Sequence, residues 1–293
     1  MEQPLSEAAR RSAEPAALRR AERLAAGVVQ ALADEVTLSP KPGLVDIRSR
    51  GAHRDLDWAL MCLSAQTLRP TFTAMAEAGQ RIRDLVALRE RIGHLGRLGE
   101  ATMLRATGGI NTHRGAIWSL GLLVTAAAQV PGATSAAEVT GHAGALARLP
   151  DRFAPLQTGN KGERACRQYG VGGARSQAQA GFPHITNVAL PELQRSRRRG
   201  DPEDAARLNA LLAVMGELDD TCVLSRGGTR ALRRTHLGAQ AVLEAGGVAA
   251  TDGRRALHRL DTELLALNVS PGGAADLLAA TLFLDRLANE FTH

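Results

Sequence analysis

The spacing of apolar side chains along the chain predicts a helical protein. Residues 14–36 carry apolar side chains at mixed three- and four-residue intervals, as on one face of a helix, at Leu18, Leu24, Val28, Val29, Leu32 and Val36. Similar spacing predicts further helices at 55–68, 77–92, 202–218, 230–245, 254–267 and 273–291. Residues 115–129 are apolar nearly all round, which predicts a buried central helix.

Strand signals are weak throughout the sequence, because runs of alternating β-branched residues are missing. We therefore predict an all-α fold, a single compact multi-helix domain with Gly/Pro-rich loops between the helices. This domain is expected to span residues 14–293, after a flexible N-terminus at residues 1–13. A chain of 293 residues is long enough to bury a large core.

Composition and targeting signals narrow the class. Hydrophobic residues make up 44% of the chain and charged residues 23%, which excludes a disordered chain. No run approaches the roughly 18 apolar residues of a membrane span, and the N-terminus lacks an apolar signal core, so we expect neither membrane insertion nor secretion. The three cysteines, Cys62, Cys166 and Cys222, match no zinc spacing, and a reducing cytoplasm fits them.

The basic charge of the chain admits two kinds of partner. Lys and Arg number 36 against 30 Asp and Glu, a net charge of +6. Proteins that bind single-stranded nucleic acid stack bases on aromatic rings, and aromatic residues make up only 3% of this chain. We interpret the cluster at 195–199 (RSRRR) as a solvated loop. A small phosphorylated substrate explains the charge as well, because Arg makes bidentate phosphate contacts.

The breaks between the predicted helices carry the chemistry. Five of them combine Gly, Pro and small polar residues with charged or hydrogen-bonding side chains, at 39–53, 107–115, 170–183, 219–228 and 268–276. Ordinary connectors in helical bundles need only a Gly cap and a few polar residues. Five such loops together predict convergence on one anionic ligand.

The first loop contains one of only two lysines in the chain, Lys41, between Pro40 and Pro42. Gly43 would let the backbone approach a ligand, and the alternative is a structured turn with an exposed Lys. Asp46, Asp55 and Asp57 follow, and they could hold Mg²⁺, which prefers oxygen ligands and bridges to phosphates. The alternative for Asp55 is a helix N-cap or first-turn acid.

The other four loops offer similar groups. Gly-rich backbone at a helix start forms a phosphate cradle, and each loop adds a cation, an acid or an imidazole to it. The alternatives are a capped Gly turn, a charged helix end and, for Phe182, a core side chain, which we favour over a ring covering a base. The candidate residues are Gly108, Gly109, Asn111, Thr112, His113 and Arg114, then Gly172, Gly173 and Arg175, then Asp219, Asp220, Arg226, Gly227 and Gly228, and finally Ser270, Gly272 and Gly273, with Asp276 in the following turn.

In their order along the chain, these segments resemble the triphosphoribosyl-dephospho-CoA synthase family. The matching stretches are LSPKPGLVD with GAHRDLD, TGGINTHRGAIWSLGLL, GGARSQAQAGFP with ALP, DTCVLSRGG and NVSPGGAADLLA. They span about residues 36–282, nearly the whole chain. Each stretch alone is moderately specific, and the ordered set is strongly specific.

The resemblance implies a reaction and one nucleotide site on which the loops converge. The family takes ATP and 3′-dephospho-CoA, releases adenine and joins the 5-triphosphoribosyl group to the 2′-hydroxyl of dephospho-CoA. The product is the prosthetic-group precursor for the acyl carrier subunit of malonate decarboxylase or citrate lyase, and a carrier-protein transferase attaches it. The sequence does not distinguish these two pathways and leaves the oligomeric state open.

The reaction suggests roles for the candidates. We expect Lys41, Arg114, Arg175 and Arg226 to bind phosphates, helped by the backbone of Gly43 and the other loop glycines. Asp46, Asp55 and Asp220 are expected to act as Mg²⁺ ligands or as the base. His53, Asn111 and His113 are expected to orient or protonate the substrate.

Two positions depart from the family pattern. Arg114 stands where the family commonly has Lys, which keeps the charge, and Ser176-Gln177 stands where it commonly has Gly-Glu. Gln177 therefore has no acid–base role in this scheme. Two other functions stay open: another ATP-using helical phosphotransferase or nucleoside glycohydrolase, and a non-catalytic basic nucleic-acid-binding helical protein.

Overall fold

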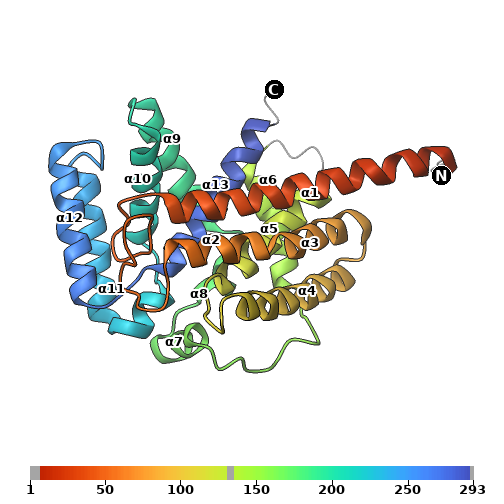
Figure 1. The fold of residues 1–293 in the computed structure, drawn as a ribbon, viewed down its shortest axis with the longest axis horizontal. Helices are drawn as coiled ribbons and strands as arrows, with labels where there is room; N and C mark the ends of the chain where they lie inside the picture. Colours follow the sequence, from red (N-terminus) through yellow and green to blue (C-terminus); the bar gives the residue numbers. More distant parts are fainter. Residues whose placement is uncertain (1–6, 131–134, 291–293) are drawn as a thin grey trace.

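The computed structural model describes residues 7–130 and 135–290, and every regular element in those ranges is helical. The predicted all-α fold is thus confirmed (Figure 1). In chain order the elements are α1 (Glu7–Thr37), α2 (Trp58–Thr67), α3 (Arg69–Arg81), α4 (Leu85–Ala106), α5 (Arg114–Gln129), α6 (Ala136–Arg148), α7 (Lys161–Tyr169), α8 (Gly173–Gln179), the π-helix η1 (His184–Ala189), α9 (Leu190–Arg198), α10 (Glu203–Met215), α11 (Thr221–Glu244), α12 (Thr251–Ala266) and α13 (Gly272–Glu290).

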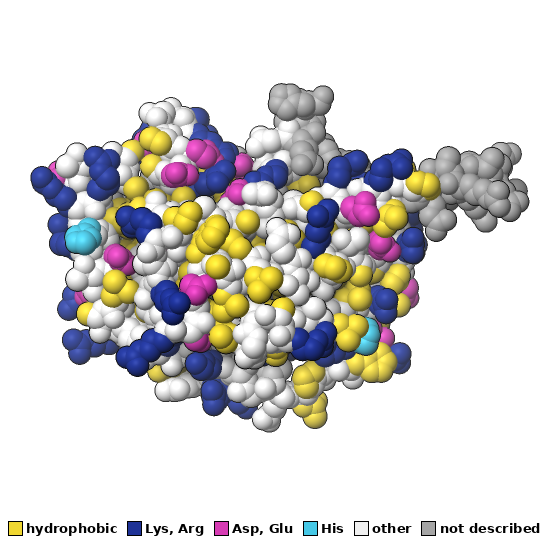
Figure 2. Space-filling model, viewed as in Figure 1, with side chains coloured by type: hydrophobic (Ala, Val, Ile, Leu, Met, Phe, Trp, Pro, Cys, Tyr) yellow, Lys and Arg dark blue, Asp and Glu magenta, His cyan; other side chains and the backbone are white. Residues whose placement is uncertain are grey.

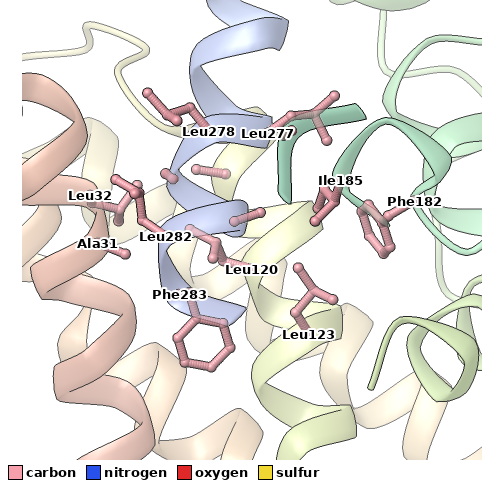
Figure 3. Packing of buried hydrophobic residues seen from close by; sticks show 14 of the residues in the cluster. Ala31, Leu32, Leu120, Leu123, Phe182, Ile185, Leu277, Leu278, Leu282 and Phe283 are labelled. Atoms are coloured by element: carbon pink, nitrogen blue, oxygen red, sulfur yellow. The ribbon is translucent and has the colours of Figure 1, made fainter. Parts of the chain in front are cut away.

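The helices pack around α5 and α13. Helix α5 contacts α3, α6, α13, α4 and α1, and its residues from Leu120 to Ala128 are all buried, as predicted for a central helix. Figure 3 shows Leu120 of α5 beside Leu282 of α13, with Leu32 of α1 next to Leu282 and Leu123 of α5 on the side of Ile185. The core contains many Ala residues, whose small side chains allow the helices to approach closely, and few bulky aromatic rings.

The long helix α1 crosses the molecule in Figure 1, and α2 and α3 run alongside it. Helices α11 and α12 pack together and form the opposite end of the molecule. Helix α1 begins at Glu7, so residues 1–6 of the expected flexible segment lie outside the described residues, and the division after residue 13 stays a prediction.

Two predicted helices have wrong boundaries. The segment 77–92 is interrupted, because α3 ends at Arg81 and the Asp84 side chain caps a new helix by accepting from the Ala87 N–H at 2.8 Å. The segment 230–245 belongs to the longer α11, which starts at Thr221 and bends at Gly228, where φ is 66° and ψ is −165°.

Helical structure between residues 136 and 198 was not predicted, although Ser135 and Asn160 cap α6 and α7 with their side chains. The prediction of a solvated loop at 195–199 is wrong, because this cluster lies at the end of α9. Arg197 donates to both Glu203 and Asp285, and Arg199 pairs with Asp201. Figure 2 likewise shows Lys and Arg interspersed with Asp and Glu over this face.

Within the described ranges, we find no helix with the length and apolar character that a bilayer crossing requires.

Candidate functional site

Lys41 lies in the loop between α1 and α2 and is buried, not exposed as in the alternative interpretation. Its ammonium forms an ion pair with Glu35, a residue of the last turn of α1 that the sequence had not singled out. Burial raises the pKa of Glu35, while the charge and hydrogen bond of Lys41 lower it, with a net rise. Lys is almost never fully buried without a paired anion. Only this requirement could have pointed to Glu35 as the partner of Lys41 before the structure was known.

Asp46 organises the backbone of the same loop. One carboxylate oxygen accepts from the Ser39 hydroxyl at 2.7 Å and the Lys41 N–H at 3.2 Å, and the other accepts from the Arg48 and Ser49 N–H groups at 2.8 Å each. Burial alone would raise the pKa of Asp46, but these hydrogen bonds bring it below its usual value. Since protein donors occupy both oxygens, the geometry favours a loop-organising role over metal binding.

Asp55 does not cap α2. The N-cap is Asp57, which accepts from the Leu60 N–H at 2.9 Å, while the exposed Asp55 lies 3.5 Å from the His53 ring. Arg226 also reaches His53, at 3.1 Å, and donates to the Ala52 carbonyl at 2.8 Å. Burial, and next the charge of Arg226, lower the pKa of His53, so its imidazole is neutral near pH 7.

In the second loop, Gly108 and Gly109 form the turn that ends α4. Both have positive φ, 65° and 87°, and the Gly109 N–H donates to the Leu104 carbonyl at 2.7 Å. A Cβ at either position would meet nothing within 4 Å, so the space beside this turn is open. Asn111 accepts from the Arg114 N–H at 3.2 Å, and the Arg114 guanidinium forms an ion pair with Glu100.

His113 is the N-cap residue of α5 and is almost fully buried, with 2% of its surface exposed. Its Nδ1 lies 2.8 Å from the Ser64 hydroxyl, which also meets the Thr112 hydroxyl at 2.6 Å. Its Nε2 has no hydrogen-bond partner within the part of the chain that the structure describes. Burial, followed by the positive charge of Lys41, lowers the pKa of His113 to about 4, so the ring is neutral at pH 7.

The third predicted loop, 170–183, is only partly irregular, because the short helix α8 lies within it. This segment lies beside α5 through Trp118, whose indole N–H donates to the Ala174 carbonyl of α8 at 3.2 Å. Its neighbour Arg175 is exposed and makes no ion pair among the described residues. The Gln177 Oε1 accepts a hydrogen bond from His184 Nδ1 at 3.0 Å. Phe182 is fully buried, so the preferred interpretation as a core residue is confirmed.

Asp220 ties the fourth loop to the fifth. One carboxylate oxygen accepts from the Cys222 N–H at 2.8 Å at the start of α11, and the other accepts from the Ala274 N–H at 3.0 Å at the start of α13. A Cβ at Gly273 would lie 3.1 Å from this carboxylate. Burial raises the pKa of Asp220, although these N–H groups counteract part of the rise. Asp220 therefore holds two helix N-termini together.

Several of the predicted glycines allow close packing between loops. Gly43 donates to Asp261 at 2.9 Å, and its Cβ would lie 2.7 Å from the Val269 carbonyl oxygen. A Cβ at Gly227 would lie 2.7 Å from Val269, and one at Gly173 would lie 2.7 Å from the Cys166 sulfur. The remaining predicted glycines pack in similar ways: Gly172 against Ser176, Gly228 against Tyr169 and Gly272 against Cys222.

Two further groups in the fifth segment stand out. Ser270 is 2% exposed, and its hydroxyl finds no hydrogen-bond partner among residues 7–130 and 135–290. Asp276, in the first turns of α13, packs against Gly115 of α5, where a Cβ would lie 1.9 Å from its Oδ2. Burial, and next the charges of Glu35 and Asp220, raise the pKa of Asp276 well above its usual value. The sequence had placed Asp276 beside a motif without giving it a role.

The contacts connect the loops to one another. Arg226 joins the first loop to the fourth, Asp220 joins the fourth to the fifth, and Gly115 meets Asp276 where the second approaches the fifth. The third loop touches the fourth where Gly173 meets Thr221. Asp55 is exposed at the edge of this cluster, and Arg175 makes none of these contacts.

The three predicted metal ligands do not form a metal site by themselves. Asp46 and Asp220 use their oxygens to hold backbone N–H groups, and Asp55 lies beside His53. In the described part of the chain, no three His, Cys, Asp or Glu side chains are grouped as metal ligands would be. The carboxylates present thus do not fit a resident Mg²⁺ held by protein alone.

Comparison with known proteins shows where this chain belongs. The family described as CitG, ATP:dephospho-CoA triphosphoribosyl transferase, matches residues 21–293. A 2-(5''-triphosphoribosyl)-3'-dephosphocoenzyme-A synthase of Klebsiella pneumoniae is 60% identical over 257 residues, which cover 88% of this chain and 91% of that protein. A probable synthase of the same name from Stutzerimonas stutzeri (strain A1501) is 59% identical over 268 residues, or 91% of this chain and 92% of that protein. No solved structure matches the chain.

The fold and the loop contacts define an all-α protein whose charged and polar side chains meet where five inter-helix segments come together. The matches place that protein among the transferases. The chain belongs to the ATP:dephospho-CoA triphosphoribosyl transferase family, and the family resemblance seen in its motifs is thereby confirmed.

Proposed function

We propose that the protein transfers the 5-triphosphoribosyl group of ATP to the 2′-hydroxyl of 3′-dephospho-CoA and releases adenine. The single observation that supports this most strongly is the family match over residues 21–293, which includes every loop of the site. The reaction breaks the bond between C1′ of the ribose and N9 of adenine while the triphosphate stays on the product.

The charges of the site suit this chemistry. Positive charge develops on the ribose as the glycosidic bond breaks, and carboxylates nearby stabilise it. The starts of α5, α11 and α13 lie among the loop contacts, and helix N-termini favour anions such as phosphates. Among the described residues, Arg226 and Arg175 are two of the exposed cations that a triphosphate could reach.

Product analysis tests the proposed function. The purified protein is incubated with ATP, Mg²⁺ and 3′-dephospho-CoA, and the products are identified by mass spectrometry. We expect free adenine together with a triphosphoribosyl adduct of dephospho-CoA. Release of ADP would identify a phosphotransferase, release of adenine with free ribose triphosphate would identify a glycohydrolase, and no reaction with either substrate would reject the proposal.

Mg²⁺ enters this scheme as a companion of ATP and not as a resident ion, because the predicted carboxylates are engaged by protein donors. Mg²⁺ usually keeps several waters and binds through substrate phosphates. Addition of EDTA is therefore expected to stop adenine release, and re-addition of Mg²⁺ to restore it. Adenine release that is unaffected by EDTA would remove Mg²⁺ from the scheme.

The product is the precursor of a carrier-protein prosthetic group, which a partner transferase would attach to the acyl carrier subunit of malonate decarboxylase or citrate lyase. Both substrates are cytoplasmic metabolites, so the reaction belongs in the cytoplasm. Incubating the purified product with each carrier and its transferase decides between the two pathways, since only the matching carrier would gain the mass of the group.

A further inference from the structure

Most charged side chains of the site have a partner within the protein. Lys41 is paired with Glu35, Arg114 with Glu100, and Asp220 accepts backbone N–H groups from two helices. Asp276 differs from all of them. Among the described residues, its carboxylate has neither a hydrogen bond nor an ion pair, and the residue as a whole is half-buried.

An unpaired carboxylate at the position of Asp276 does not stabilise the folded protein. Its oxygen lies against the backbone of Gly115, and the nearest acidic charges are Glu35 from α1 and Asp220 at the start of α11. Partial burial beside like charges costs folding free energy unless a partner offsets it. No such partner is present in the described part of the chain, which points to a role toward a ligand.

The contact between Gly115 and Asp276 is an independent geometric argument that Asp276 has a role toward a ligand. A Cβ on this residue would lie 1.9 Å from Asp276 Oδ2, so only glycine allows the carboxylate its position at the first turn of α5. That turn directly follows the open backbone of Gly108 and Gly109, beside which a Cβ would meet nothing. The carboxylate thus lies where two segments of the site approach each other.

We infer that Asp276 is the catalytic general base of the reaction, an assignment that rests on the proposed function. Its carboxylate takes the proton of the acceptor 2′-hydroxyl as that oxygen forms a bond to C1′ of the triphosphoribosyl group. The C1′–N9 bond breaks and its electron pair leaves with adenine, which takes up a proton from solvent. The proton on Asp276 returns to solvent after the product leaves, so protons and electrons balance.

The electrostatic setting agrees with this role. The charged and titratable groups that interact with Asp276 are Glu35 of α1 and Asp220 and Cys222 at the start of α11, while His113 and Arg114 precede its neighbour Gly115 in the sequence. Arg114 is turned toward Glu100, and His113 is neutral at pH 7. Burial, and next the negative charges of Glu35 and Asp220, raise the pKa of the carboxylate and make it more basic, and a base works best when its pKa approaches the working pH.

The first test compares Asp276→Asn with the wild type and with Asp252→Asn. Asp252 is an exposed acid in the first turn of α12 and controls for loss of a carboxylate near a helix N-terminus. We expect Asp276→Asn to lower kcat for triphosphoribosyl transfer by about 100-fold or more, with ATP affinity changed only a few-fold and an unchanged or higher Tm. Asp252→Asn should match the wild type.

The second test is chemical rescue. Asp276→Ala leaves space for a small carboxylate, so sodium formate should restore part of the transfer rate while equal sodium chloride does not. Gly115→Ala keeps the carboxylate but displaces it and should lower kcat as Asp276→Asn does. Adenine release by the wild type tests the proposed function, whereas the variants test only the role of Asp276. A folded Asp276→Asn with near wild-type kcat, or an inactive Asp276→Ala that formate never rescues, would overturn the assignment.

Discussion

Lys41 and Glu35 form an ion pair whose side chains are only 1% and 5% exposed. Removing one partner leaves the other as an uncompensated buried charge, at a cost of about 3–5 kcal/mol. We therefore expect Lys41→Met to lower the free energy of unfolding by an amount in that range, measured by urea denaturation. Loss of adenine release in this variant would have two explanations: loss of the phosphate contact predicted from the sequence, and loss of stability.

A double variant separates the two effects. Glu35→Gln with Lys41→Met removes both charges, so most of the lost stability should return. If Lys41 also contacts the triphosphate, the stable double variant stays inactive. Adenine release at the wild-type rate in this double variant would assign Lys41 to structure alone.

His113 should make stability depend on pH. Its pKa is about 4 in the folded protein and ordinarily 6.5, so between these values the unfolded chain binds a proton that the folded protein does not. Stability therefore falls as the pH drops from 6.5 toward 4, by roughly 3 kcal/mol from this group. Above pH 6.5 the contribution of His113 is constant.

The difference between variant and wild type isolates this effect. Glu35, Asp220 and Asp276 have raised pKa values, so protonation of these groups stabilises the folded protein as the pH falls and opposes His113. The curve of unfolding free energy against pH should decline less steeply for His113→Asn than for the wild type. Parallel curves for the variant and the wild type would show that folding does not lower the pKa of His113.

The sequence identified many of the residues of the site but not their partners. Lys41, His113 and Asp220 stand in recognisable loop motifs, whereas Glu35 and Ser64 lie on ordinary helical stretches of α1 and α2. Their roles depend on which helix turns face each loop, which is a property of the tertiary packing. Local spacing carries no signal for that packing.

Among the elements, α11 depends on one unusual residue. Gly228 has φ 66° and ψ −165° within the helix, a conformation open essentially to glycine. We expect Gly228→Ala to cost about 1–3 kcal/mol of stability and to disturb Arg226, two residues before the bend. Thermal and urea unfolding measure the first effect, and ATP affinity measures the second.

Gly141→Ala in α6 is the matched control. Gly141 is exposed within a regular helix, and a Cβ there meets nothing within 4 Å. This change should stabilise the protein by roughly 0.4–1 kcal/mol, because alanine loses less backbone entropy than glycine. Equal effects of the two substitutions would contradict a special role for the bend.

Helices with continuous apolar periodicity were predictable, and those without it were not. The central α5 and the pattern over 14–36 follow from spacing, but α7 to α9 are short and rich in Arg, Gln and Gly. The side-chain cap at Asn160 supports α7, and tertiary packing supports all three: α7 packs against α11, α8 against α6 and α5, and α9 against α10. The boundary near Asp84 depended on a single capping side chain inside an otherwise helical pattern.

At the scale of the whole molecule, many Arg side chains of the described residues are held in ion pairs. Asp34 of α1 meets Arg286 of α13 at 2.6 Å and Arg207 of α10 at 3.6 Å, and Arg197 reaches both Glu203 and Asp285. These pairs connect helices far apart in sequence. They also reduce the basic surface on which a nucleic acid would depend.

We accordingly expect weak binding to a short labelled DNA duplex or RNA strand at physiological salt. Nucleic-acid affinity from phosphate contacts falls steeply with salt, so fluorescence anisotropy at low and physiological salt is the measurement. Tight binding that persists at physiological salt would instead favour the nucleic-acid-binding alternative over a small polyanionic substrate.

The hydrogen bond from Trp118 to the Ala174 carbonyl has a practical consequence for enzymology. The chain has only two tryptophans, and Trp58 lies at the start of α2 with its indole bonded to Thr37. In a Trp58→Phe protein, Trp118 would be the sole emitter, placed between α5 and the loop that carries Arg175. Intrinsic fluorescence in a stopped-flow instrument could then time the arrival of each substrate without any attached label.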